Sequence, residues 1–231
     1  APGPGGEAAR DEDKGFDVKA ALDKVLGASD AQITEKLRAT ITAKQLDGSI
    51  AQANERKAIE DFYASRNYAP IWIQDGRLNT RAKAVIARLK NAAADGLDAP
   101  DYPVPDFGSF SGADALAQGD IKLTQSMMTY ARHLAVGRVA PTRVLVEVDY
   151  GNHTPEPADI LKKIADAGNA DAAFDSFNPP HAGFHSLKEK LAELRGARAE
   201  VDNSIPDGPT IKPGAKDARV PALRERLHVA G

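Results

Sequence analysis

The chain has 231 residues, of which 42% are hydrophobic and 27% charged, as in an ordinary globular protein with one main core. Its net charge of −3 gives no basic field for nucleic acid, and no apolar run is long enough for a membrane span. The absence of cysteine excludes a disulfide framework, a thiol nucleophile and a thiolate metal site within these residues.

The first third of the chain predicts a tail followed by helices. Residues 1–15 mix glycine, proline and charges without periodicity, which is typical of a disordered segment. Apolar residues at helical spacing then predict helices over about 16–26, 29–46 and 49–66. Ser29 or Asp30 is expected to cap the second of these, because a short oxygen-bearing side chain can accept the first unpaired N–H groups.

Aromatic residues are concentrated at the end of the third predicted helix. Residues 62–72 contain the only tryptophan and two of the five tyrosines. Pro70 disfavours a helical residue before it, so residues 70–74 are expected to be extended. Tyr68 and Trp72 are weak candidates for stacking on sugar rings, but one tryptophan in a short apolar run favours a plug in the core.

The middle of the chain predicts two more helices. Asn79 or Thr80 is expected to begin the first, which ends at Gly96, and three prolines make 98–110 an irregular connector. Asp120 or Thr124 is expected to open the second, which Gly137 closes.

The last third predicts short elements, a linker and a final helix. Residues 143–149 resemble a strand, and 154–157 is typical of a helix start. A helix over about 183–199 is expected to bury Phe184, Leu187, Leu191 and Leu194. Proline and glycine make 201–216 a linker, and 217–231 contains a helix that begins a further domain. The predicted fold is mainly α, with one compact helical domain over 16–200.

Three candidate chemical sites are weak. His181 and His185 have the spacing of metal ligands on one helix face, but no third ligand follows from the pattern beyond Asp175 and Glu189. A hydrolase triad could be imagined from Ser126, His133 and Asp120, but no nucleophile elbow of the Gly-x-Ser-x-Gly type accompanies them. Carboxylate pairs such as Glu147 and Asp149 are interpreted as solvated faces. We therefore assign no catalytic, cofactor or metal residues.

Several landmarks nevertheless follow the order of one protein family. They are Tyr-x-Pro-x-Trp at 68–72, Asp-Gly-Leu with a tyrosine at 95–102, Leu-Thr through Gly-Arg-Val at 123–139, and Pro-x-His-x-x-Phe-x-x-Leu at 179–187. The tail at 205–227 is similar to the join into a small helical peptidoglycan-binding module. Over about residues 55–227 the chain resembles the N-terminal scaffold domain of the large periplasmic L,D-transpeptidases, which cross-link peptidoglycan.

This resemblance implies a role without chemistry. In that family the nucleophile is a cysteine, assisted by a histidine, in a separate β-rich domain C-terminal to the scaffold, and neither can be placed here because the chain has no cysteine. The expected partners are peptidoglycan and that catalytic domain, and the expected location is the periplasm. The missing initiator Met also suggests a processed product. The chain alone is expected to be inactive.

Two other functions stay open from the sequence. One is a stand-alone module that binds the cell wall or a partner enzyme, with no catalytic fusion. The other is a glycan-cleaving enzyme, which would need two carboxylates facing each other in a groove.

Overall fold

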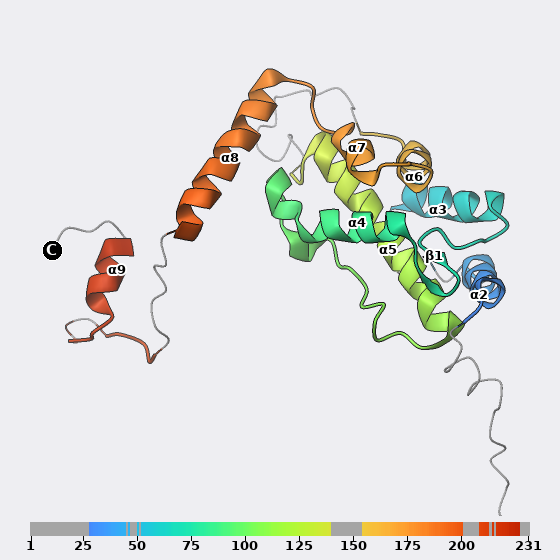
Figure 1. Ribbon diagram of the computed structural model, residues 1–231, viewed down its shortest axis with the longest axis horizontal. Helices are drawn as coiled ribbons and strands as arrows, with labels where there is room; N and C mark the ends of the chain where they lie inside the picture. Colours follow the sequence, from blue (N-terminus) through green and yellow to red (C-terminus); the bar gives the residue numbers. More distant parts are fainter. Residues whose placement is uncertain are drawn as a thin grey trace, which may run out of the picture. The chain divides into compact units, whose positions relative to one another are not determined.

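The computed structural model describes residues 28–44, 46, 50, 52–139, 154–200, 208–212, 214 and 216–226 (Figure 1), without the side chains of 197–200, 225 and 226. The chain separates into two units, Ala1–Pro179 and Pro180–Gly231. The expected tail, the helix over 16–26, the strand-like run at 143–149 and most of the linker lie outside the described residues.

The first unit is built from helices. In chain order these are α2 (Asp30–Thr42), α3 (Ala53–Ser65), α4 (Thr80–Lys90), the 3-10 helices η2 (Ala92–Asp95) and η3 (Ala99–Asp101), α5 (Gly112–Val136), α6 (Pro157–Ala165) and α7 (Ala170–Asp175). Between α3 and α4, β1 (Ile73–Gln74) and β2 (Arg77–Leu78) pair antiparallel. The prediction of a mainly α fold is confirmed.

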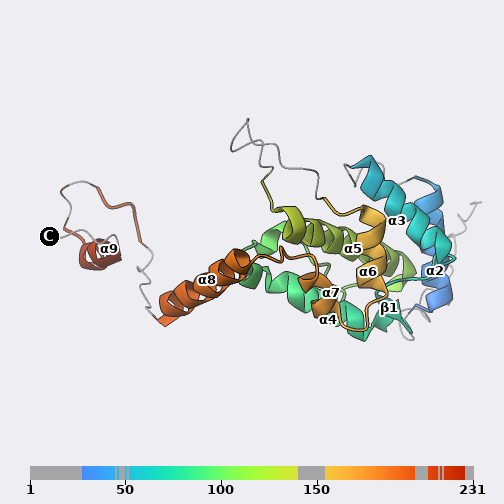
Figure 2. The same cartoon turned by 90° about the horizontal axis from the view of Figure 1, so that it is seen from above.

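Helix α5 is the central element of this unit (Figures 1 and 2), and it packs against α2, α4 and α6. Helix α3 packs on α6, and α7 packs on α4 and α6. Because neighbours surround it, α5 buries residues along almost its whole length, from Leu116 to Leu134. The prediction that Asp120 or Thr124 opens this helix is wrong, since the helix begins at Gly112 and both side chains are fully buried inside it.

The expected helix starts at Ser29 and Asn79 are confirmed, and local chemistry sets both. Ser29 forms a capping box with Gln32, and the side-chain oxygen Oδ1 of Asn79 accepts from the Ala82 N–H at 2.8 Å. Gly137 ends α5 with a positive φ of 78°, as expected, but the prediction that the preceding helix runs to Gly96 is wrong, because α4 ends at Lys90 and Gly96, with φ of 77°, ends the 3-10 helix η2.

The β1–β2 turn is tied to α2. Asp75 and Gly76 have φ angles of 52° and 68°, and their N–H groups donate to the Asp30 carboxylate at 3.0 and 3.1 Å. A Cβ atom on Gly76 would lie 2.6 Å from the carbonyl oxygen of Ala28, so only glycine fits there.

A charged cluster joins the far ends of several helices. The Arg88 guanidinium of α4 binds the Asp95 carboxylate at 2.8 Å and the Asp175 carboxylate of α7 at 2.6 Å, and the Tyr130 hydroxyl of α5 donates to Asp95. The Asp95 side chain is only 1% exposed, so this carboxylate depends on its partners for compensation.

The second unit contains α8 (Ala182–Glu200) and α9 (Val220–Arg226). Arg219 precedes α9 and donates to the Asp217 carboxylate at 2.8 Å and to the Pro209 carbonyl oxygen at 2.7 Å. The expectation that α8 buries all four of its large apolar side chains is wrong, because Leu187 is 73% and Leu194 is 57% exposed.

Candidate functional site

The aromatic stretch at 62–72 is fixed by a buried carboxylate on α5. Asp120 is fully buried, and its oxygens accept from the Tyr63 hydroxyl at 2.6 Å and from the N–H groups of Ile71 and Trp72 at 3.0 and 2.9 Å. Pro70 makes this backbone extended, so the two N–H groups that follow it have no helical partner and turn to Asp120 instead.

A threonine one turn further along α5 completes the cluster. Thr124 Oγ1 lies 2.9 Å from the indole Nε1 of Trp72 and 3.0 Å from the hydroxyl oxygen of Tyr63. We call Tyr63, Trp72, Asp120 and Thr124 the clasp. All four side chains are buried, and every one of them is hydrogen-bonded within the cluster.

The buried environment of the clasp raises the pKa values of Asp120 and Tyr63. Burial raises the pKa of Asp120 to about 6, although the hydrogen bonds from Tyr63 and the two backbone N–H groups act in the opposite direction. Burial and the nearby Asp120 charge raise the pKa of Tyr63 well above its ordinary value. Since these hydrogen bonds run from α3 and the aromatic stretch to side chains of α5, the clasp fastens both to α5.

The two predicted sugar-stacking residues have different environments. Trp72 has no exposed surface, which is the position expected of a core plug. Tyr68 is half-buried, with the Arg38 guanidinium 4.9 Å from its ring centre. Sugar stacking by either residue stays a prediction.

The described structure contains a groove of about 790 Å³ alongside α5, within the size range of small-ligand sites. Helix α3 and the connector before α5 supply the rest of its lining. The lining residues are Ile50, Gln52, Glu55, Ile59, Asp101, Pro103, Val104, Pro105, Asp106, Phe110, Lys122, Gln125, Ser126, Met128, Thr129 and Arg132. We call this the α5 groove.

Both sides of the α5 groove are fastened to α5. The Arg132 guanidinium binds the Glu55 carboxylate of α3 at 3.1 Å, and the Ser126 hydroxyl donates to the Pro103 carbonyl oxygen of the connector at 2.7 Å. The Glu55 and Arg132 side chains are only 13% and 23% exposed, so solvent screens this ion pair less than a surface pair. The groove is therefore held open in advance of any ligand.

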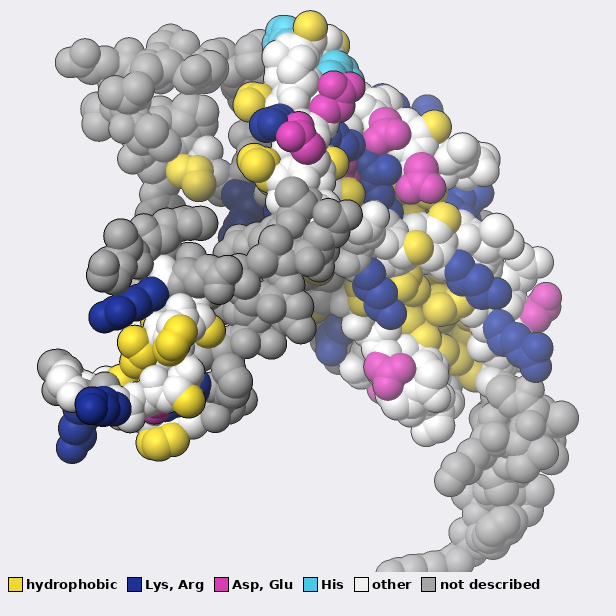
Figure 3. Space-filling model, turned by 60° about the vertical axis from the view of Figure 1, so that its left-hand side comes forward, with side chains coloured by type: hydrophobic (Ala, Val, Ile, Leu, Met, Phe, Trp, Pro, Cys, Tyr) yellow, Lys and Arg dark blue, Asp and Glu magenta, His cyan; other side chains and the backbone are white. Residues whose placement is uncertain are grey.

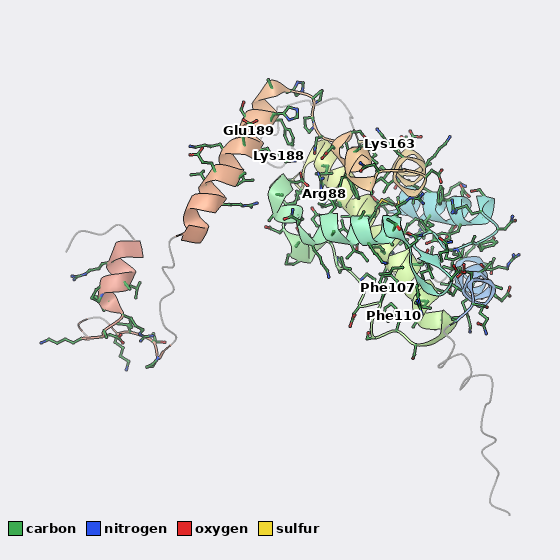
Figure 4. All side chains as sticks on the ribbon, viewed as in Figure 1. Arg88, Phe107, Phe110, Lys163, Lys188 and Glu189 are labelled. Atoms are coloured by element: carbon green, nitrogen blue, oxygen red, sulfur yellow. The ribbon has the colours of Figure 1, made fainter. Side chains whose placement is uncertain are left out.

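The Phe107 and Phe110 rings hold the connector against the same helix. Their centres are 5.4 Å apart, and both rings lie at the connector end of α5 (Figure 4). They approach α5 at Gly119, where a Cβ atom would lie 2.5 Å from the Phe110 ring and 2.9 Å from the Phe107 ring. A glycine inside the helix thus makes room for the connector.

The groove lining suits binding better than catalysis. Its hydroxyl groups, Ser126 and Thr129, have no histidine beside them in the lining, and His133 instead pairs its Nδ1 with the Tyr102 hydroxyl at 2.9 Å. Burial and the charges of Arg132 and Arg138 lower the pKa of His133. The arrangement does not form the triad considered from the sequence.

Two of the three carboxylates in the groove lining are bound by arginines. Glu55 is bound by Arg132, and Asp101 is bound by Arg138 at 2.7 Å. A glycosidase needs one carboxyl group that keeps a proton to donate, and an arginine partner favours the opposite state. Glu55 and Asp101 are therefore unsuited to donate that proton, while the third carboxylate, Asp106, accepts from the Gly108 N–H at 3.2 Å.

Two further expectations concern metals and membranes. Among the described residues, no three histidine or acidic side chains come together as metal ligands, and His181 and His185 are no exception. Within the same residues, no helix has the length and apolar character needed to cross a bilayer.

Sequence reasoning missed the α5 groove and the role of Asp120. The available signal was a charged residue between apolar ones, because Asp120 stands beside Ile121 and within one turn of Leu116 and Ala117. A carboxylate at a core position of a helix must find partners, and this argues against a capping role.

The first unit is thus a set of packed helices with a groove along its central helix. The sequence model of the Scaffold domain family matches residues 57–191, and the chain belongs to this family of L,D-transpeptidase scaffold domains. No match was found among curated proteins or among solved structures.

Proposed function

We propose that this chain is the non-catalytic scaffold portion of a peptidoglycan L,D-transpeptidase. In this role it positions a cysteine-dependent catalytic domain of the same polypeptide and helps to accommodate peptidoglycan. The observation that carries the proposal is the family match over residues 57–191 in a chain without cysteine. The proposal also places the parent protein in the periplasm, which cell fractionation tests.

The α5 groove is the surface that we assign to peptidoglycan. It combines apolar side chains such as Ile59 and Met128 with the amides and hydroxyl groups of Gln52, Gln125 and Thr129. Glycan strands and their stem peptides present the same mixture of apolar faces and hydrogen-bonding groups. A groove of fixed width, fastened on both sides to α5, would hold such a polymer with little loss of side-chain entropy.

Cosedimentation with isolated peptidoglycan sacculi tests this assignment. Thr129 is half-buried in the groove lining, so Thr129→Arg fills the groove and should remove the protein from the pellet. Thr42→Arg adds the same charge at an exposed position at the end of α2 and should leave binding unchanged. Failure of the unmodified chain to sediment would remove the peptidoglycan contact and leave only the positioning role.

The coding sequence downstream of Gly231 tests the positioning role. We propose that α9 is the first helix of a peptidoglycan-binding-like domain, so the codons after Gly231 should encode further short helices and then a β-rich domain with a cysteine. A stop codon or an unrelated domain at that point would favour the second candidate, a stand-alone module that binds the cell wall or a partner enzyme.

A further inference from the structure

Helix α8 carries a row of large apolar side chains. Phe184, Leu187, Leu191 and Leu194 recur at spacings of three, four and three residues, which is the a and d pattern of a helix that pairs with another helix. Leu187 and Leu194 are 73% and 57% exposed, and hydrophobic side chains are uncovered along this helix in Figure 3. Single exposed leucines are common, but a continuous row marks a contact surface.

The charges beside this row are sorted by sign. With about 100° of rotation per residue, Lys188, Lys190 and Arg195 fall on the two edges of the apolar row, at the e and g positions. Glu189 and Glu193 fall on the opposite face of the helix. In the part of α8 whose side chains are described, both edges of the row are therefore basic. We call the row with its basic edges the α8 seam.

The sign of the edges disfavours a second copy of this chain as the partner. In a parallel pair, edge positions g and e meet, which places Lys190 of one copy near Arg195 of the other. In an antiparallel pair, g positions face g positions and e positions face e positions. Lys190 of one copy then lies near Lys190 of the other, and Lys188 or Arg195 lies near a basic e residue of the other copy. Both arrangements bring like charges together.

A membrane surface fits less well than a helix. Membrane-lying helices combine a broad apolar face with a strongly basic polar face. The α8 seam is narrow, and Glu189 and Glu193 on the polar face offset most of the basic charge.

We propose that the α8 seam docks an amphipathic α-helix whose edge positions carry aspartate or glutamate. The apolar row would supply the buried contact, and Lys188, Lys190 and Arg195 would select acidic edges. Lys190 now binds Glu193 on its own helix at 2.7 Å, with both side chains more than half exposed. Such a pair is weak, so Lys190 can turn to a partner carboxylate at little cost. The inference goes beyond the proposed function and does not depend on it.

Two synthetic peptides test the proposal by fluorescence anisotropy against the full chain. Both have about three heptads with leucine at a and d, and one has glutamate at e and g while the other has lysine. The glutamate peptide should bind at least tenfold more tightly than the lysine peptide. Equal binding of the two peptides, or no binding of the glutamate peptide, would overturn the proposal.

Variants at exposed positions locate the contact. Leu187→Ser with Leu194→Ser should weaken binding of the glutamate peptide at least tenfold, while Val139→Ser, at another exposed apolar residue, should not change it. Replacing Lys188, Lys190 and Arg195 with glutamate should reverse the preference between peptides. Unchanged affinity in the leucine variant, an unreversed preference, or self-association through α8 in sedimentation velocity would each contradict the seam.

Discussion

The stability of the first unit depends on single polar atoms in its core, and Thr124 is an example. Its hydroxyl oxygen is the acceptor for the indole N–H of Trp72, and neither side chain reaches solvent. Thr124→Val keeps the shape of the side chain but leaves that N–H buried without its acceptor. We expect a loss of about 2 kcal/mol in the free energy of unfolding, measured by urea denaturation.

Thr129→Val is the matched control for this substitution. Thr129 lies on the same helix, is half-buried, and its hydroxyl has no hydrogen bond among those seen in the described residues. The change should be nearly neutral. Equal effects of the two substitutions would show that the hydroxyl of Thr124 does not support Trp72.

Asp120 should make stability depend on pH. Its pKa rises from 3.8 in the unfolded chain to about 6 in the folded one, so between these values the folded state keeps a proton that the unfolded state releases. This contribution is complete below pH 3.8 and is lost as the pH rises through about 6. The whole shift corresponds to about 3 kcal/mol.

Comparing the free energy of unfolding of the wild-type chain with that of Asp120→Asn isolates the contribution of Asp120. Asparagine does not titrate, and the contributions of all other titrating groups are the same in both proteins and cancel in the difference. The amide nitrogen has no lone pair for the Trp72 N–H, whereas a protonated carboxyl oxygen keeps one. The wild-type chain should therefore be the more stable at pH 4, and its advantage should shrink by about 2 kcal/mol by pH 7. An advantage that stays constant or grows with pH would contradict the raised pKa.

At the scale of elements, the connector and α5 depend on the absence of a side chain at Gly119. Gly119→Ala would push a Cβ atom into the Phe107 and Phe110 rings, which must then move away from α5. We expect destabilisation of about 1–3 kcal/mol despite the better helix propensity of alanine. Thermal unfolding followed by circular dichroism measures it.

Gly196→Ala provides the comparison within another helix. Nothing lies within 4 Å of a Cβ atom at Gly196 in α8, so only the propensity gain of up to about 1 kcal/mol remains. Destabilisation by both substitutions, or by neither, would show that the rings do not pack against α5 at Gly119.

Elements that depend on local chemistry were predictable from the sequence. The caps at Ser29 and Asn79 and the end of α5 at Gly137 each follow from one residue and its immediate neighbours. Contacts between distant residues were not predictable in this way. Asp120 binds Tyr63, which lies 57 positions away in the sequence. The α5 groove is formed by α3, the connector and α5 together. No local sequence pattern predicts either feature.

Helix α8 shows that the burial of a side chain could not be predicted from sequence spacing alone. Its apolar spacing correctly predicts a helix, and that spacing also led to the wrong expectation that Leu187 and Leu194 are buried. Periodicity identifies the face of a helix that can make contacts, but only a partner decides whether the face is covered.

At the scale of the whole molecule, the clasp and the groove are the features that fit the proposed scaffold role. The clasp keeps α3 and the aromatic stretch on α5, and the two fastenings of the groove keep its sides in place. Under the proposed function, the acyl transfer to a neighbouring amine needs an activated nucleophile, which another part of the polypeptide would supply as a thiolate.

The most direct test compares this chain with the complete polypeptide encoded by its gene. Each protein is incubated with a disaccharide-tetrapeptide, and cross-linked dimer is measured by liquid chromatography and mass spectrometry. We expect dimer from the complete polypeptide and none from residues 1–231 alone. Dimer formation by this chain alone, or its absence with the complete polypeptide, would contradict the scaffold function.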